Sequence, residues 1–271
     1  MSGIYNAHNF RRGHFEAPPY DKGSVRSVYH VREAEVAKLM QLQEPLDVFL
    51  SHDWPRGVAN CGHCDRQGLL KRKPFFRKEV NEDSLGSPAG AHLLQELKPK
   101  RWFSAHLHVK FEAKVFHCAP CRPDTLAARG PGRPAPGASS TDFLALDKCL
   151  PGRQFLQILD LPPGEGAGPG APALEYDPEW LAVLRSYHHL MSASRGPVQL
   201  PPEALGRQGP KPEDVEWVRE NFGQLEVPAN FVVTAPPHGA GDAGRGRAPG
   251  LAPNPQTTEL LRRLGLPYNL G

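Results

Sequence analysis

The spacing of hydrophobic residues along the chain predicts alternating helices and strands, which is the pattern of an α/β fold. Residues 26–43 carry apolar side chains at helical spacing up to a proline, which predicts one helix. Short apolar runs at residues 46–50 and 101–105 predict two buried strands. Between them we expect a second helix, which begins at Ser87 or Pro88 and ends before the next proline.

The later part of the chain shows the same two periods. Residues 141–161 predict paired strands around a Leu-Pro-Gly turn. Residues 175–191 and 212–225 predict amphipathic helices. No segment of the sequence repeats another.

Glycine and proline gather in three windows that we expect to be disordered loops. The 271 residues include 27 Gly and 30 Pro, together well above the roughly 12% of an average chain. The windows cover residues 119–140, 161–173 and 235–255. The first window predicts a flexible linker that separates residues 1–118 from residues 141–271.

Basic charge and histidine share the part of the chain before the first window. Residues 1–118 contain 18 Lys and Arg against 13 Asp and Glu, together with nine of the twelve histidines. The whole chain carries a net charge of +3. A modest basic excess is compatible with a phosphate-bearing partner without requiring one.

The sequence predicts a soluble intracellular protein that does not enter a membrane. No apolar run reaches 18 residues, and the first fifteen residues lack the apolar stretch of a signal peptide. The five cysteines are an odd number, which argues against a disulfide framework and for a reducing compartment.

Histidines follow both predicted strands at the point where each strand ends. His52 follows the first strand, and His106 and His108 follow the second. Side chains two residues apart share a face of an extended segment, so His106 and His108 could reach one metal or two adjacent metals. His52 would join them if the strands are sheet neighbours, although many His-x-His pairs bind nothing. Asp53 could orient the His52 imidazole, or be an ordinary exposed carboxylate.

Several motifs, spread from the first residues to the last, are distinctive in combination. They are Gly13-His14-Phe15-Glu16, Pro18-Pro19-Tyr20, Arg26-Ser27-Val28-Tyr29-His30-Val31-Arg32, Ser51-His52-Asp53-Trp54-Pro55, the segment from Trp102 to Phe111, the segment from Phe143 to Pro151, and Asn254-Pro255-Gln256-Thr257-Thr258-Glu259. Together they resemble the lariat debranching enzymes, metallophosphoesterases that open the 2′–5′ phosphodiester bond of excised intron lariats. The resemblance is interrupted mainly by the windows rich in proline and glycine.

The resemblance implies a site for two divalent metals, Fe²⁺, Zn²⁺ or Mn²⁺, about 3.5–4 Å apart. His52 and His106 would bind the first metal and His108 the second. The family's earlier motifs, an opening Cys-x-His, a Gly-Asp and a Gly-Asn-His-Glu with the catalytic histidine, have no match ahead of His52. The catalytic residue is therefore unassigned. We expect the chain alone to bind metal weakly or partially and to debranch poorly, because three histidines supply no bridging carboxylate.

The resemblance also implies that residues 8–24 form a loop that recognises the lariat. Arg11 and Arg12 would neutralise phosphates there. The rings of His14, Phe15 and Tyr20 would stack on bases near the branch, or they would pack the loop onto the body of the protein.

The implied fold has two parts. Residues 1–118 would be the C-terminal half of the two-sheet α/β metallophosphoesterase fold, and residues 141–271 the family's mixed α+β C-terminal domain. The implied partner is branched intron lariat RNA in the nucleus, together with spliceosomal or intron-turnover proteins. Two alternatives remain: a non-catalytic RNA-binding or splicing-associated adaptor, and an incomplete gene model.

Two Cys-x-x-Cys pairs, Cys61 with Cys64 and Cys118 with Cys121, suggest a structural zinc site. The 53 residues between the pairs exceed the usual spacing of roughly 15–20 residues. Zinc is therefore the weaker hypothesis for these cysteines.

The run from Lys71 to Lys78 combines basic residues with Phe75 and Phe76. It could follow an RNA backbone or act as a nuclear localisation signal. A solvated basic helix face is an equally good interpretation.

Overall fold

The protein divides into two compact units in a computed structural model. The described residues are 1–61, 63–117, 139–162, 173–234 and 254–268. Unit 1 comprises Met1–Asn6 and Gln43–Pro169, and unit 2 comprises Ala7–Leu42 and Gly170–Gly271. Each unit therefore draws on both sides of the predicted linker at residues 119–140. Most of that linker, and most of the other two Gly/Pro-rich windows, lies outside the described residues.

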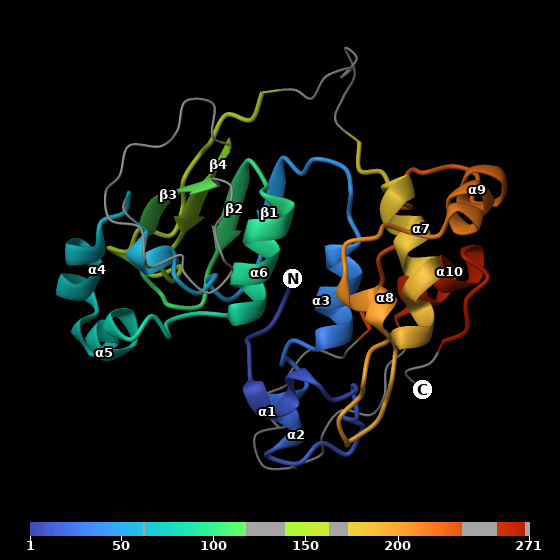
Figure 1. Ribbon diagram of the computed structural model, residues 1–271, viewed down its shortest axis with the longest axis horizontal. Coiled ribbons are helices and arrows are strands. Elements are labelled where there is room, and N and C mark those ends of the chain that lie inside the picture. The colour runs from blue at the N-terminus through green and yellow to red at the C-terminus, as the bar shows by residue number, and fades with distance from the viewer. Residues whose placement is uncertain (62, 118–138, 163–172, 235–253, 269–271) are drawn as a thin grey trace. The chain divides into compact units, whose positions relative to one another are not determined.

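Unit 1 is built on a four-stranded sheet in the order β1-β2-β4-β3 (Figure 1). The strands are β1 (Val48–Leu50), β2 (Arg101–Ser104), β3 (Phe111–His117) and β4 (Ser139–Ala145). β2 is parallel to both β1 and β4, whereas β3 runs antiparallel to β4. The α/β prediction and the two predicted strands are thus confirmed, although β1 buries only Phe49 and leaves Leu50 62% exposed.

In the described part of unit 1, three helices accompany the sheet: α4 (Arg66–Arg72), α5 (Arg77–Asn81) and α6 (Pro88–Leu97). A short 3₁₀ turn at Val58–Asn60 precedes α4, and another at Pro74–Phe76 lies between α4 and α5. α6 begins where the sequence predicts, because the Ser87 hydroxyl accepts a bond from the Gly90 N–H at 3.0 Å and caps the helix.

Aromatic rings fill the core of unit 1. The ring of Phe49 stacks on Trp102 with centroids 4.1 Å apart, and Trp54 stacks on Phe111 at 4.9 Å. Phe143 meets the edge of Trp54 at 5.3 Å. All five side chains are 6% exposed or less, so the strands and the loop after β1 share one core.

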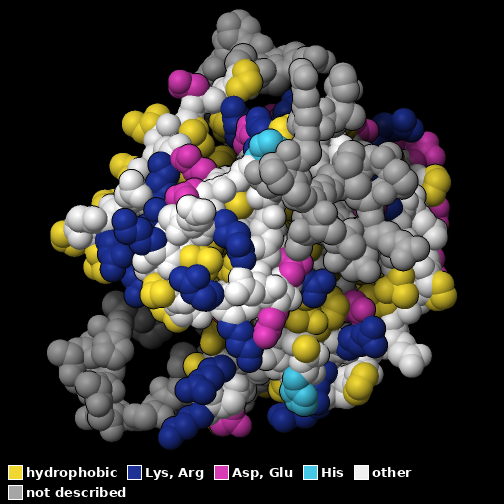
Figure 2. Space-filling view, turned by 60° about the vertical axis from the view of Figure 1, so that its left-hand side comes forward, with side chains coloured by type: hydrophobic (Ala, Val, Ile, Leu, Met, Phe, Trp, Pro, Cys, Tyr) yellow, Lys and Arg dark blue, Asp and Glu magenta, His cyan; other side chains and the backbone are white. Residues whose placement is uncertain are grey.

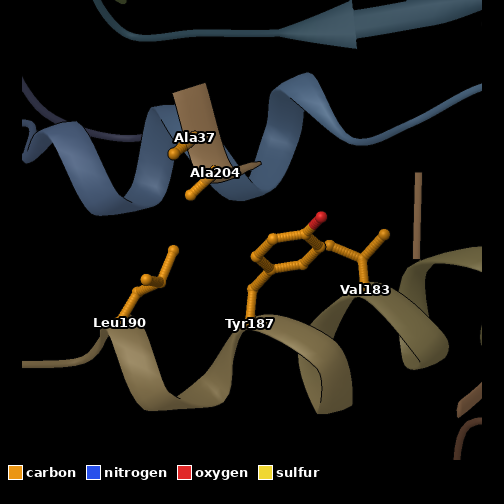
Figure 3. Packing of buried hydrophobic residues seen from close by; sticks show 5 residues of the cluster. All are labelled: Ala37, Val183, Tyr187, Leu190 and Ala204. Atoms are coloured by element: carbon orange, nitrogen blue, oxygen red, sulfur yellow. The ribbon is translucent and has the colours of Figure 1, made fainter. Parts of the chain in front are cut away.

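The described part of unit 2 is helical. Its helices are α1 (Ala7–Phe10), α2 (Ser24–Ser27), α3 (Glu33–Met40), α7 (Pro178–Tyr187), α8 (Pro202–Leu205), α9 (Pro212–Asn221) and α10 (Pro255–Arg263). Figure 3 shows Val183, Tyr187 and Leu190 pointing toward Ala37 and Ala204. A second cluster joins α7, α9 and the end of α10 through Leu181, Ala182, Val218, Phe222 and Leu264.

The prediction of one continuous helix over residues 26–43 is wrong. α2 and α3 are separated by an extended Arg32, with φ −108° and ψ 149°. The Arg32 side chain is 1% exposed and donates to the backbone carbonyls of Ser27 and His30. A buried guanidinium requires such acceptors, and in an unbroken helix these carbonyls would bind backbone N–H groups instead.

The predicted pair of strands over residues 141–161 is also wrong in its second half. β4 accounts for the first segment, but no strand occurs among residues 149–162. Leu156 and Ile158 are 76% and 88% exposed, so this segment does not bury the apolar side chains that suggested a strand. Among the described residues, no helix is both long and apolar enough to cross a lipid bilayer.

Candidate functional site

The carboxyl ends of β1 and β2 bring His52 and His106 to the same edge of the sheet. Leu50 lies opposite Phe103 in the parallel register. The pairing continues beyond the strands, because the Ser51 N–H donates to the Phe103 carbonyl at 2.9 Å and the Ala105 N–H donates to the His52 carbonyl at 3.1 Å. The condition that the two strands be neighbours is therefore met.

The two imidazoles face each other directly. Nδ1 of His106 lies 3.0 Å from Nε2 of His52, with ring centroids 4.9 Å apart and planes at 67°. Two nitrogens bound to one tetrahedral metal at the usual bond lengths would lie about 3.3 Å apart. The observed separation is that of a hydrogen bond between the two rings. Because it is close to the value for a shared metal, a metal that takes both nitrogens would replace this bond.

His108 does not join this pair in the way that the sequence predicts. His106 and His108 have φ values of 55° and 51°, so their segment is turned and not extended. The Leu107 N–H donates to the Ala105 carbonyl at 2.7 Å within this turn. The described residues contain no group of three or more His, Cys, Asp or Glu able to hold a metal. The structure thus pairs His52 with His106 and leaves His108 exposed nearby in sequence.

A network of bonds beneath the histidines fixes the loops that carry them. The buried Trp102 indole donates to the hydroxyls of Ser51 and Ser104, at 2.8 and 3.1 Å. The Ser51 hydroxyl donates to the Asp53 carbonyl at 2.7 Å, and the Trp54 indole donates to the Ala105 carbonyl at 2.9 Å. These side-chain hydrogen bonds therefore fix the loops after β1 and β2, which carry the two imidazoles.

Asp53 is buried and is not the exposed carboxylate of the simpler interpretation. Its carboxylate accepts bonds from the Trp54 N–H at 2.9 Å and the Tyr5 N–H at 3.3 Å. Burial raises the pKa of Asp53, while the two backbone donors oppose that rise. These contacts anchor the loop after β1 to the N-terminal segment, and a role in orienting His52 stays a prediction.

The surroundings favour neutral imidazoles. Partial burial, followed by the neighbouring His106, lowers the pKa of His52. Desolvation and then the charges of Lys148 and Lys73 lower the pKa of His108. Neutral imidazole is the form that binds metals.

Lys148 is a further neighbour of His108, and the sequence pattern did not single it out. β4 is parallel to β2, with Ser104 opposite Ala145, so the residues after β4 reach the same sheet edge. A third apolar run that ends in polar residues at Asp147 and Lys148 was the available signal.

The loop predicted to bind RNA belongs to unit 2, where most of its candidate residues have partners. Arg11 lies 3.7 Å from Glu33, and His14 lies 3.5 Å from Glu35. The Arg12 backbone bridges to Pro197.

The aromatic candidates of this loop are half-buried. The guanidinium groups of Arg32 and Arg195 lie 5.7 and 5.3 Å from the centroid of the Phe15 ring. Tyr20 is likewise half-buried. Packing therefore accounts for part of the Phe15 surface, and RNA contacts by these residues stay predictions.

The first cysteine pair is described and the second is not. The Cys64 thiol donates to the Cys61 carbonyl at 2.9 Å. Cys118 and Cys121 lie outside the described residues, so the zinc hypothesis stays a prediction.

Comparison with known proteins gives one consistent family. The family model of the lariat debranching enzyme C-terminal domain matches residues 138–269. The lariat debranching enzyme of Arabidopsis thaliana is 43% identical over 271 residues, which is all of this chain and 58% of that relative. The Homo sapiens enzyme is 44% identical over 98% of this chain and 47% of its own length. The Schizosaccharomyces pombe enzyme is 35% identical over 98% of this chain and 71% of its own length. The chain thus spans about half the length of the first relatives it matches.

Proposed function

Because this chain belongs to the lariat debranching enzyme family, we propose that it contributes to hydrolysis of the 2′–5′ phosphodiester bond of branched intron lariat RNA. The observation that carries the proposal is the facing pair of His52 and His106 at the carboxyl ends of two parallel strands. Open parallel sheets place their ligands at that edge.

In this proposal, His52 and His106 hold one divalent metal, Fe²⁺, Zn²⁺ or Mn²⁺, and His108 contributes to a second. Bound metals of this kind lower the pKa of water and stabilise a leaving oxygen. The chain's own part is to hold the two imidazoles in place, through the bonds among Trp102, Ser51 and Ser104.

The remaining proposals concern architecture and setting. The sheet of unit 1 would be part of the two-sheet metallophosphoesterase fold. The loop at residues 8–24 would meet the RNA through Arg11, Arg12, His14, Phe15 and Tyr20. The protein would act in the nucleus with spliceosomal or intron-turnover proteins.

Metal titration of the purified chain tests the histidine pair without relying on activity. We expect His52→Ala and His106→Ala each to weaken Mn²⁺, Zn²⁺ or Co²⁺ binding tenfold or more, and His108→Ala to weaken it less. His92→Ala, a half-buried histidine on α6, is the matched control. Equal metal affinity in all four variants would contradict the proposal.

Branched RNA tests the activity expected of these 271 residues by themselves. A dinuclear site needs anionic ligands to hold two dications against their repulsion, and the histidine pair has no such partner among the described residues. We therefore expect the chain alone to cleave branched RNA poorly with any of the three metals. Rapid cleavage would show that the described histidines suffice.

A further inference from the structure

The segment between α4 and α5 exposes an aromatic ring. Phe75, in the 3₁₀ turn Pro74–Phe76, is 68% exposed. Its ring contacts Phe76 edge-to-face, with centroids 4.5 Å apart, and the Lys73 ammonium lies 5.9 Å from its centroid. One face of a planar ring is thus held in place beside a cation and open to solvent.

Basic residues precede and follow this ring in the sequence. We call Lys71, Arg72, Lys73, Phe75, Arg77 and Lys78 the α4–α5 ridge. The apolar side chains of the same helices, Leu69, Leu70 and Val80, are buried, so the helices turn their basic side outward. Figure 2, whose view brings this part of unit 1 forward, shows Lys and Arg side chains beside hydrophobic ones. Arg72 has an acidic partner, Asp65, at 3.7 Å.

The ridge begins next to the candidate metal site. The Arg72 guanidinium donates to the Lys110 carbonyl at 3.2 Å, two residues after His108. Lys73, like Lys148, lies close enough to His108 for its charge to act on that side chain. Lys73 and Phe75 follow Arg72 in sequence, so the ridge continues from the segment that carries His108.

We propose that the α4–α5 ridge binds a single-stranded arm of the branched RNA, with one base stacked on Phe75 and adjacent phosphates on Lys71 and Lys73. Single-stranded RNA offers both a planar base and a phosphate in every nucleotide, which matches a ring flanked by lysines. An acidic peptide would match the lysines and leave the ring without a planar partner. The identity of the RNA rests on the proposed function, whereas binding of a single strand does not.

Fluorescence anisotropy of labelled RNAs tests the ridge on the whole purified chain without added metal. The probes are a branched RNA with one long arm, the same branch trimmed to its central nucleotides, and a linear RNA of the long arm's sequence. We expect Phe75→Ala to weaken long-arm and linear binding about tenfold. We expect Lys73→Gln to reduce the salt dependence of log K by about 0.7, the contribution of one phosphate of a single strand.

Two matched variants control for loss of an exposed ring and of an exposed lysine. Phe231 is 73% exposed in unit 2, and Lys100 lies at the amino end of β2, opposite the histidines. Phe231→Ala and Lys100→Gln should bind all three RNAs like the parent chain. Circular dichroism of each variant establishes that it is folded.

The outcomes separate the ridge from the proposed function. The ridge proposal is overturned if the Phe75→Ala variant binds the long-arm RNA as tightly as the parent does. It is also overturned if this substitution lowers the affinity for the trimmed branch as much as the affinity for the long-arm RNA. If the parent does not prefer branched to linear RNA but Phe75→Ala still lowers the affinity for the linear RNA, the ridge proposal stands and the lariat assignment loses support. If no RNA binds, both are overturned.

Discussion

The two units hold their candidate residues by different means. In unit 1, His52 and His106 stand directly after paired strands, and the register of the sheet brings them together. In unit 2, the loop at residues 8–24 belongs to no sheet among the described residues. Backbone bonds join it to residues 192–198, and a buried ion pair between Arg32 and Glu16 also holds it. Sheet geometry can be anticipated from spacing, whereas a long-range ion pair depends on how distant segments fold.

We expect the largest change in stability when the Arg32–Glu16 pair is broken. The two groups lie 2.7 Å apart and both side chains are 1% exposed. Arg32→Met leaves the Glu16 carboxylate buried without a counterion, and removing one partner of such a pair typically costs about 3–5 kcal/mol. We expect that loss in the free energy of unfolding, measured with urea by near-ultraviolet circular dichroism.

A second variant separates the charge from the packing. Arg32→Met combined with Glu16→Gln removes the unpaired charge and should recover part of the loss. A cost below about 1 kcal/mol for Arg32→Met alone would mean that the pair does not hold the loop.

A smaller effect tests the support beneath the histidines in unit 1. Ser51→Ala combined with Ser104→Ala leaves the buried Trp102 indole N–H without its two acceptors. An orphaned buried donor costs about 1–3 kcal/mol, and urea unfolding followed by indole fluorescence measures it. Ser84→Ala, which changes an exposed hydroxyl, should stay within about 0.5 kcal/mol. Equal stability of the double variant and this control would show that the network does not stabilise the edge.

Sequence spacing predicted much of unit 1 and missed one strand. The apolar runs located β1 and β2, and the histidines after them proved to be neighbours. β3 was overlooked although Phe111, Ala113 and Val115 alternate with polar residues and are all buried. Period-two alternation was visible there, so this miss was avoidable.

Other features could not be predicted from local pattern. The left-handed backbone at His106 and His108 depends on a turn between strands. Neither position is a glycine, so nothing in the sequence indicated a positive φ there. Likewise, the buried Arg32 interrupts a segment whose apolar spacing is helical. Its acceptors include the Gly13 carbonyl at 3.0 Å, nineteen residues away, and periodicity carries no information about such a partner.

The smallest expected effect concerns Glu35, where the predicted RNA loop meets α3. Burial raises the pKa of this carboxyl, but bonds from His14 and Lys38 outweigh it and lower the pKa from 4.5 to about 2. The unfolded chain therefore takes up the proton first, so the stabilisation is present above pH 4.5 and is lost as the pH falls toward 2. Since the side chain is 37% exposed, we expect less than about 1 kcal/mol. Urea unfolding of the parent and of Glu35→Gln at pH 6, 4 and 2.5 measures this stabilisation. The difference between the two free energies of unfolding should become smaller as the pH falls. A difference that is the same at all three pH values would mean that His14 does not tie the loop to α3.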